Sequence, residues 1–337
     1  MLPMSPLVPL FLLACSPGGG ADSPLAVDGA LVEAGGLNAW ILSWSTPEAS
    51  DGVVRLVGGD GGRREFTDVE SDAEGLEHRA VILGLPAGTN WTATAYSSAS
   101  GREYATDAFD FETSPVPTDL PTVTVSVPPA DGLTGFVVLP LATLEGVQFA
   151  ILDLDGNYVW WRTSFAMACF RAEYEQATGV LSTCSADEAD GSHFSTESLV
   201  DGTGTTVVTS QGHHDFVALS DGSYLALGED RRQVDGLNVV GDTVVLVPAA
   251  GGEASVVWNA WDSFAYDGIG VESPNGMSWP HLNSLEFDEG TGKLLLGAYS
   301  RDSILQVDRA TGAIDWELGG ELDDFGLEGD ETFVHPH

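Results

Sequence analysis

Three side chains able to handle an anionic group lie within one short stretch, residues 279–301. His281 and Asn283 stand at the start of an apolar, strand-like run, and Arg301 follows the next such run. An imidazole can move a proton near neutral pH, an amide can donate a hydrogen bond, and a guanidinium can hold two oxygens of an oxyanion. Together these groups suit the transfer of a group carried on an oxyanion.

Histidine recurs at the starts of similar stretches. The chain has only seven histidines, and they include the pair His213 and His214, then His281, then His335 and His337. One histidine at a strand start is more often structural than catalytic, but three in register reverse that expectation. Adjacent residues on a strand point to opposite faces, so only one histidine of the first pair is expected to face a shared site.

The segments that would position these histidines form a repeat. Strand, glycine-containing turn, strand and tryptophan follow one another three times, over 150–160, 245–258 and 304–316. The second and third of these are each preceded by another hairpin-like segment, over 214–227 and 283–296. Two hairpins make four strands, the unit of a β-propeller blade, and equivalent blade positions converge at one end of the central channel. The repeat therefore predicts a propeller in which the histidines meet.

An all-β unit without a catalytic cluster precedes the repeat. Residues 28–115 contain alternating apolar strands separated by turn signals, at 39–44, 52–57, 80–83 and 91–96. The segments 83–91 and 109–113 resemble the second half of a fibronectin type III sandwich, with Trp44 as its buried tryptophan. Prolines in 116–121 indicate a linker. The expected domains are thus a leader and tether (1–27), a sandwich (28–115), this linker and a propeller (122–337).

Five motifs in the second part resemble the motif series of the bacterial arylsulfate sulfotransferases. In that family the order is H-[DE]-F, H-x-N-S, S-R, W-x-L-G-G and F-x-x-Q-H. The corresponding segments here are His214-Asp215-Phe216, His281-Leu282-Asn283-Ser284, Ser300-Arg301, Trp316-Glu317-Leu318-Gly319-Gly320 and Phe333-Val334-His335-Pro336-His337. The resemblance runs from about residue 135 to the last residue, and its first motif selects His214 rather than His213.

The resemblance implies a six-bladed propeller with a small N-terminal β-domain, and an enzyme that moves a sulfuryl group from an aryl sulfate to a phenol. No nucleotide donor, other cofactor or metal is implied. His337 takes the position of the nucleophile, which carries a transient sulfo group. Arg301 would clamp the sulfate oxygens and Asn283 would donate a hydrogen bond to them. His214 and His281 would exchange protons with the phenols.

The chain departs from the family pattern at its C-terminal end. Pro336 stands where the family has Gln, and His335 competes with His337 as the nucleophile. About four blades of typical length fit between Thr122 and residue 337. We therefore expect a C-terminally truncated member of the family, with about four of six blades, which as a fragment would be inactive if the propeller stays open.

Charge excludes one class of partner. Twelve basic residues stand against 51 acidic ones, for a net charge of −39, and Lys293 is the only lysine. Such a surface repels nucleic acid and anionic lipid, so neither is an expected partner.

The N-terminus predicts export. An uncharged apolar run ends in Leu12-Leu13-Ala14-Cys15 and reads as a signal-peptide core. These four residues resemble a bacterial lipobox, so Cys15 would be lipidated and anchor a periplasmic or cell-surface lipoprotein, with plain secretion as the alternative. Export to an oxidising compartment would let Cys169 and Cys184 bridge across a hairpin that turns near 177–179. Two free buried thiols are the other interpretation.

Two further functions stay open at this point. A non-catalytic surface propeller that binds a ligand or protein would bind without turning over a sulfate ester. A propeller hydrolase that uses a metal would lose activity with chelators. The donor, the acceptor and the oligomeric state are not specified by the sequence.

Overall fold

The structure is a computed structural model that describes residues 24–130, 132–143, 146–163, 171–175, 180–187, 191–209, 212–249, 252–321 and 323–326. In these ranges the chain is all-β, as predicted, apart from two single turns of helix, α1 (Ala260–Ser263) and η1 (Tyr299–Arg301). None of the helices in this part of the chain is long and apolar enough to cross a membrane. The predicted leader and Cys15 lie outside the described residues, so lipidation stays a prediction.

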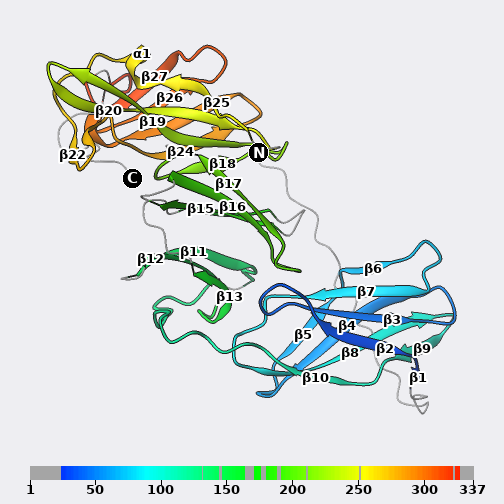
Figure 1. The fold of residues 1–337 in the computed structure, drawn as a ribbon. Coiled ribbons are helices and arrows are strands. Elements are labelled where there is room, and N and C mark those ends of the chain that lie inside the picture. The colour runs from blue at the N-terminus through cyan, green and yellow to red at the C-terminus, as the bar shows by residue number, and fades with distance from the viewer. Residues whose placement is uncertain are drawn as a thin grey trace, which may run out of the picture.

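The first ten strands build two sheets. One has the order β1-β9-β8-β4-β5, with β10 also paired to β8, and the other has the order β2-β3-β7-β6. Their bounds are β1 (Leu25–Ala26), β2 (Gly29–Glu33), β3 (Trp40–Ser45), β4 (Asp51–Gly58), β5 (Arg63–Phe66), β6 (Val69–Ser71), β7 (Glu77–Ile82), β8 (Asn90–Ala99), β9 (Arg102–Ala105) and β10 (Phe109–Glu112). Figure 1 shows them together in blue and cyan, at the N-terminal end of the described chain.

These two sheets share one core because their strands alternate between buried and exposed residues. On β3, Trp40, Leu42 and Trp44 are buried, and they pack with residues of β4, β7 and β8. Each fully buried large apolar side chain stabilises the fold by about 1.5 to 3 kcal/mol. The four strands predicted by alternation are confirmed, and so is the burial of Trp44, which is 3% exposed and donates from Nε1 to Ser97 Oγ (2.8 Å).

After a stretch, 113–135, in which the described residues form no strand, the described residues form four further small sheets, which are antiparallel except for the parallel pair β20–β23. They comprise β11-β12-β13, β14-β15-β16-β17, β18-β19-β20-β21 and β24-β25-β26-β27, and β23 and β22 extend the third from β20. The bounds are β11 (Phe136–Thr143), β12 (Gly146–Asp153), β13 (Tyr158–Thr163), β14 (Ala172–Glu175), β15 (Val180–Asp187), β16 (Gly191–Ser198), β17 (Gly204–Thr209), β18 (Phe216–Ala218), β19 (Tyr224–Val234), β20 (Leu237–Val247), β21 (Ser255–Asn259), β22 (Val271–Ser273), β23 (Gly276–Trp279), β24 (Leu282–Asp288), β25 (Lys293–Ala298), β26 (Ser303–Asp308) and β27 (Ile314–Gly319).

The hairpins predicted from the repeat are confirmed. The pairs β18–β19, β20–β21, β24–β25 and β26–β27 are antiparallel, and each four-stranded unit therefore consists of two hairpins. Strands β14 and β15 pair antiparallel, as in the hairpin expected between the two cysteines. Cys169 lies outside the described residues, so the disulfide with Cys184 stays a prediction.

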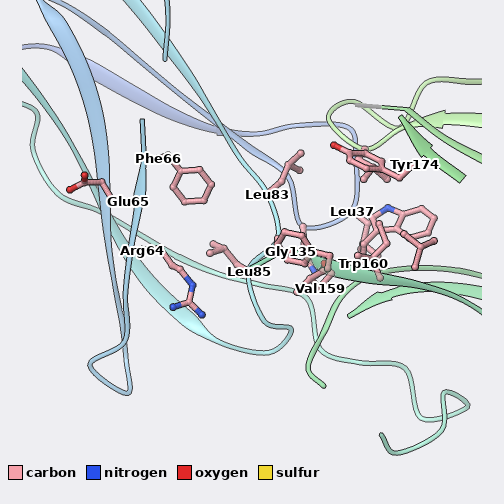
Figure 2. Close-up of a pocket in the computed structure, with 16 residues that line it drawn as sticks. Leu37, Arg64, Glu65, Phe66, Leu83, Leu85, Gly135, Val159, Trp160 and Tyr174 are labelled. Atoms are coloured by element: carbon pink, nitrogen blue, oxygen red, sulfur yellow. The ribbon is translucent and has the colours of Figure 1, made fainter. Parts of the chain in front are cut away.

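A mostly apolar cavity of about 610 Å³ lies between the first two sheets and the two sheets that follow them, β11–β13 and β14–β17. Phe66 and Leu83 line it from the N-terminal side, and Val159, Trp160 and Tyr174 line it from the other, as Figure 2 shows. Beside the cavity, Leu37 and Leu83 pack on a cluster that contains Trp160, which joins the two parts of the chain.

Candidate active site

The segment 279–301 brings its polar residues to one end of the β24–β25 hairpin. His281 directly precedes β24, Asn283 lies within it, and Arg301 ends the η1 turn that follows β25. Because the strands are antiparallel, the start of β24 lies beside the end of β25, with Leu282 opposite Ala298. The N–H of Tyr299 donates to the His281 carbonyl (3.1 Å), which fastens η1 to the start of β24.

His214 joins this group from the neighbouring sheet. Its ring centroid lies 5.2 Å from that of His281, edge to face, and the His281 ring lies 5.3 Å from that of Tyr299. His281 Nδ1 is 2.9 Å from Ser278 Oγ. The predicted convergence of His214 and His281 is therefore confirmed.

Both histidines adopt a backbone conformation that side chains seldom take. His214 has φ 54° and His281 has φ 58°, in the left-handed region. Such a conformation costs on the order of 1 to 3 kcal/mol in a residue other than glycine, and these conformations concentrate at functional sites. The two residues in this conformation are the ones whose rings meet edge to face between the sheets.

A cleft of about 620 Å³ opens beside the pair, and every one of the four small sheets contributes to it. The site therefore depends on the arrangement of all four. Its lining residues are Pro140 from β11, Arg171, Ala172 and Glu173 from the start of β14, His214 and Asp215 before β18, and Asn283 and Ser284 from β24.

Arg171 is the cation of this cleft, and the sequence reasoning missed it. Its Nη1 lies 3.5 Å from Asp215 Oδ2 and donates to Glu286 Oε1 (2.8 Å) and to the Leu285 carbonyl (3.1 Å), while Nε donates to Glu173 (2.7 Å). It thus links three sheets. The one signal for Arg171 in the sequence was that basic residues are rare. The chain has only 12 of them, and this one lies in a strand-like segment.

Asp215 is buried at the floor of the cleft. Its carboxylate accepts from the N–H groups of Leu285 (2.7 Å) and Phe216 (2.9 Å). Burial raises the pKa of Asp215 to about 6, although both N–H groups and the charge of Arg171 act in the opposite direction. The Arg171 guanidinium lies closer to Glu173 and Glu286 than to the Asp215 carboxylate.

Arg301 is packed beside the cleft but is not one of the residues that line it. Its side chain is 8% exposed, its guanidinium lies 4.0 Å above the Phe264 ring, and Nη2 is 3.4 Å from Glu317 Oε1. Glu317 is itself 2% exposed. The guanidinium predicted to clamp the sulfate therefore already faces a buried carboxylate, that of Glu317.

Of the pair His213 and His214, only His214 lines the cleft, as predicted, but strand alternation is not the reason. The two residues precede β18 and do not form a regular strand, and the left-handed backbone of His214 turns its ring toward that of His213. The two Nδ1 atoms lie 2.9 Å apart. Alternation along a strand was thus the wrong rule for this pair.

The remaining predicted residues lie outside the described part of the chain. These are His335 and His337, the two candidates for the nucleophile. Among the described residues there is no group of three or more His, Cys, Asp or Glu side chains placed to hold a metal ion.

Comparison with known proteins is informative for the family of the chain and not for similar solved structures. No curated protein matches the chain. Among solved structures, similarities include the nidogen–laminin complex (8% identity, 79% of this chain and 92% of that chain, TM-score 0.37), hydrazine synthase of Kuenenia stuttgartiensis (10%, 88% and 80%, 0.37) and TolB from Acinetobacter baumannii (10%, 86% and 78%, 0.30). At these TM-scores they carry no functional argument.

The family model described as Arylsulfotransferase (ASST) matches residues 136–336, which is more than half of the chain and contains all four small sheets with their cleft. This chain belongs to the arylsulfotransferase family.

Proposed function

We propose that this protein transfers a sulfuryl group from an aryl sulfate to a phenolic acceptor without a nucleotide donor. Family membership indicates a sulfotransferase-like enzyme with small aryl sulfate substrates. The observation that carries the proposal is the contact of His214 with His281 beside a cleft that also contains Asn283 and Arg171.

The chemistry needs a nucleophile, proton exchange and stabilisation of charge on the sulfuryl oxygens. In the first half-reaction an imidazole nitrogen attacks sulfur, the bond from sulfur to the aryl oxygen breaks, and the leaving phenolate takes a proton from His214 or His281. In the second half-reaction the acceptor phenol returns that proton, its oxygen forms a bond to sulfur, and the bond from sulfur to the imidazole nitrogen breaks, which restores the free histidine. We assign the nucleophile to His337, with His335 as the alternative, on the family resemblance.

Binding of the sulfate is assigned to Asn283 and Arg301. The Asn283 amide belongs to the cleft, where it can donate to a sulfuryl oxygen. Arg301 reaches the site from η1. Its guanidinium could bind two sulfate oxygens only while it also interacts with Glu317.

For the architecture, we propose a fibronectin type III-like sandwich over 28–115 followed by a partial propeller of about four blades. The sheet orders β2-β3-β7 and β5-β4-β8-β9 support the first part, because they divide seven strands between two facing sheets as that fold does. The contribution of each small sheet to one cleft supports the second.

We propose further that the protein is exported as a lipoprotein anchored through Cys15. The apolar run before Cys15 supports this. Labelling with a radioactive fatty acid in cells should mark the wild-type chain and not Cys15→Ser. A chain that is secreted without label would agree with export but refute the lipid anchor.

The activity is tested with p-nitrophenyl sulfate and phenol. We expect release of p-nitrophenolate that depends on phenol, and a loss of about 100-fold or more in kcat/KM for His214→Gln and for His281→Gln, because general acid–base groups contribute about 10²- to 10⁴-fold. His78→Gln is the matched control, since His78 lies in the sandwich and bonds to Thr46, Ser50 and Ser71. Turnover that survives both site changes would refute the proposal.

One observation supports a second candidate, a propeller that binds an anionic ligand or a partner without turnover. Glu317 already neutralises Arg301, which weakens any clamp on sulfate. Calorimetric titration with an aryl sulfate separates the two functions: saturable heat with no phenolate release favours binding alone.

A further inference from the structure

Three side chains form a line behind the cleft. Asp242 Oδ1 lies 3.2 Å from His213 Nε2, and His213 Nδ1 lies 2.9 Å from His214 Nδ1. His214 in turn meets His281 and lines the cleft. The line thus runs from a carboxylate on β20, through one imidazole, to the imidazole that lines the cleft.

Asp242 is fixed at the head of this line. It is 1% exposed, and its other oxygen, Oδ2, accepts from the N–H of Leu282, the residue that follows His281. One carboxylate therefore holds His213 with one oxygen and the start of β24 with the other. His213 Nε2 also lies 3.2 Å from the Gly228 carbonyl. Both neighbours of Nε2 are acceptors, so Nε2 must carry a proton.

The proton on Nε2 determines the rest of the line. A neutral His213 with its proton on Nε2 has only a lone pair on Nδ1, so the contact between the two Nδ1 atoms requires His214 to donate from its own Nδ1. A neutral His214 then has its lone pair on Nε2. In this state the imidazole in the cleft is a base.

One additional proton reverses the role of His214. If the proton enters at His214 Nε2, the resulting imidazolium still donates from Nδ1 to His213, and the Asp242 carboxylate balances its charge. In this state His214 is an acid that can protonate a leaving phenolate.

We propose that Asp242 and His213 are positioning residues that determine which nitrogen of His214 carries its proton and so set the switch of His214 between acid and base. The inference deepens the proposed function, on which it rests for the identity of the reaction. In the first half-reaction Nε2 gives its proton to the leaving phenolate, and in the second it recovers one from the acceptor phenol. The count of protons is restored after each cycle.

The charged groups around the line are identified. His213 faces Asp242 and Glu229 from β20 and β19, and His214 faces His213 and His281. In the cleft that His214 lines, the charged groups are Arg171, Glu173 and Asp215. Of these, Asp242 alone touches His213 through a side-chain oxygen among the described residues.

The first test measures the ring nitrogens directly in the wild-type chain. Long-range ¹H–¹⁵N NMR spectra, assigned with His213→Gln and His214→Gln, report the tautomer of each histidine. Above the pKa of the pair we expect His213 protonated on Nε2 and His214 protonated on Nδ1. A His214 protonated on Nε2 under these conditions would overturn the inference, and this measurement does not depend on activity.

The second test uses Asp242→Asn with Asp308→Asn as the matched control, because Asp308 lies on β26 in a surface pair with Lys293. Loss of the carboxylate should lower the pKa of the His213–His214 pair and move the corresponding limb of the pH profile of kcat/KM down by about one unit. We expect kcat to fall about 10- to 100-fold, the range found when a partner that orients a metal-bound imidazole is lost, with KM changed less than threefold. An unmoved limb would refute the switch.

The outcomes separate this inference from the proposed function. If no aryl sulfate is turned over but His214 has the expected tautomer, the function fails and the positioning role stands. If the wild type turns over donor and His214 has the other tautomer, the positioning role fails alone. Should Asp242→Asn not fold, the spectra of the wild type decide the matter.

Discussion

Asp215 shows how the cleft balances charge at the scale of single residues. Arg171 faces three carboxylates, those of Glu173, Asp215 and Glu286, and Asp215 is the most distant of them. Burial therefore outweighs attraction at Asp215, and its pKa rises. The pKa of Arg171 is raised as well: its burial alone would lower that pKa, but the hydrogen bond to Glu286 and the surrounding carboxylates outweigh burial. The arginine is thus held charged, and the aspartate next to His214 is the group that can become neutral.

This balance predicts a pH-dependent stability. The pKa of Asp215 is raised from 3.8 to about 6 in the folded state, so the folded state binds the proton more tightly than the unfolded one. The resulting stability is present below about pH 4 and is lost as the pH rises through 6, by roughly 2 to 3 kcal/mol. In urea unfolding, wild type should lose about that much relative to Asp215→Asn between pH 4 and pH 7.5.

Asp308→Asn is the control for this measurement. In the wild type the pKa of Asp308 is lowered to about 2, first by the hydrogen bond from Lys293, so Asp308 is ionised at both pH values. The difference between wild type and Asp308→Asn should therefore change little over this range. If the stability difference between wild type and Asp215→Asn also stays constant over this pH range, the pKa of Asp215 is not raised.

At the scale of elements, the side chains of Ser284 and Asn283 on β24 fill the space beside Gly297 on β25. Gly297 on β25 lies opposite Ser284, next to a shift in the register of β24. A Cβ at Gly297 would lie 2.3 Å from Ser284 Oγ and 3.3 Å from Asn283 Oδ1. The glycine is needed here because the neighbouring strand occupies the space of a side chain.

A double-mutant cycle tests that contact. Gly297→Ala should destabilise the fold by about 1 to 3 kcal/mol, as overpacking does, and should raise KM for the donor by displacing Asn283. Ser284→Ala removes the clashing oxygen, so the double variant should recover most of the stability. Gly290→Ala is the control, since that glycine lies in the turn of the same hairpin and its Cβ would meet only Asp288 Oδ1, at 3.2 Å. Additive effects of the two changes would contradict the contact.

The elements were predictable where the pattern is local. Alternation and glycine turns suffice for hairpins such as β24–β25, and a histidine in register at two hairpin starts predicted that His214 and His281 meet. The connections that arise only in the folded chain were not predictable. Arg171 and Asp242 bond to residues of other sheets, and His213 bonds to Asp242 two strands away in its own sheet. The left-handed backbone of His214 does not follow strand alternation. Periodicity carries no information about such contacts.

At the scale of the whole molecule, one buried asparagine joins the N-terminal sheets to the small sheets that build the site. Asn38 Nδ2 donates to the Val159 carbonyl (3.2 Å), and Oδ1 accepts from the N–H of Ser114 (2.8 Å). Nearby, the N–H of Ala87 donates to the Tyr158 carbonyl (2.8 Å). Asn38 is 2% exposed and has φ 55°, so both its side chain and its backbone are specified.

Asn38→Ala should therefore loosen the junction by about 2 to 4 kcal/mol, since two buried polar groups lose a partner and the left-handed backbone gains strain. Asn38→Gly separates the two causes: it loses the same hydrogen bonds but keeps an easy positive φ, so it should recover about 1 kcal/mol of the loss. Urea unfolding followed by tryptophan fluorescence measures both variants. Limited proteolysis in the strand-free stretch 113–135 gives a second readout, and cleavage there should quicken in step with the loss of stability. Equal stability of wild type and Asn38→Ala would mean that the apolar contacts of Leu37 and Leu83 and the backbone hydrogen bond from Ala87 to Tyr158 hold the junction without the Asn38 side chain.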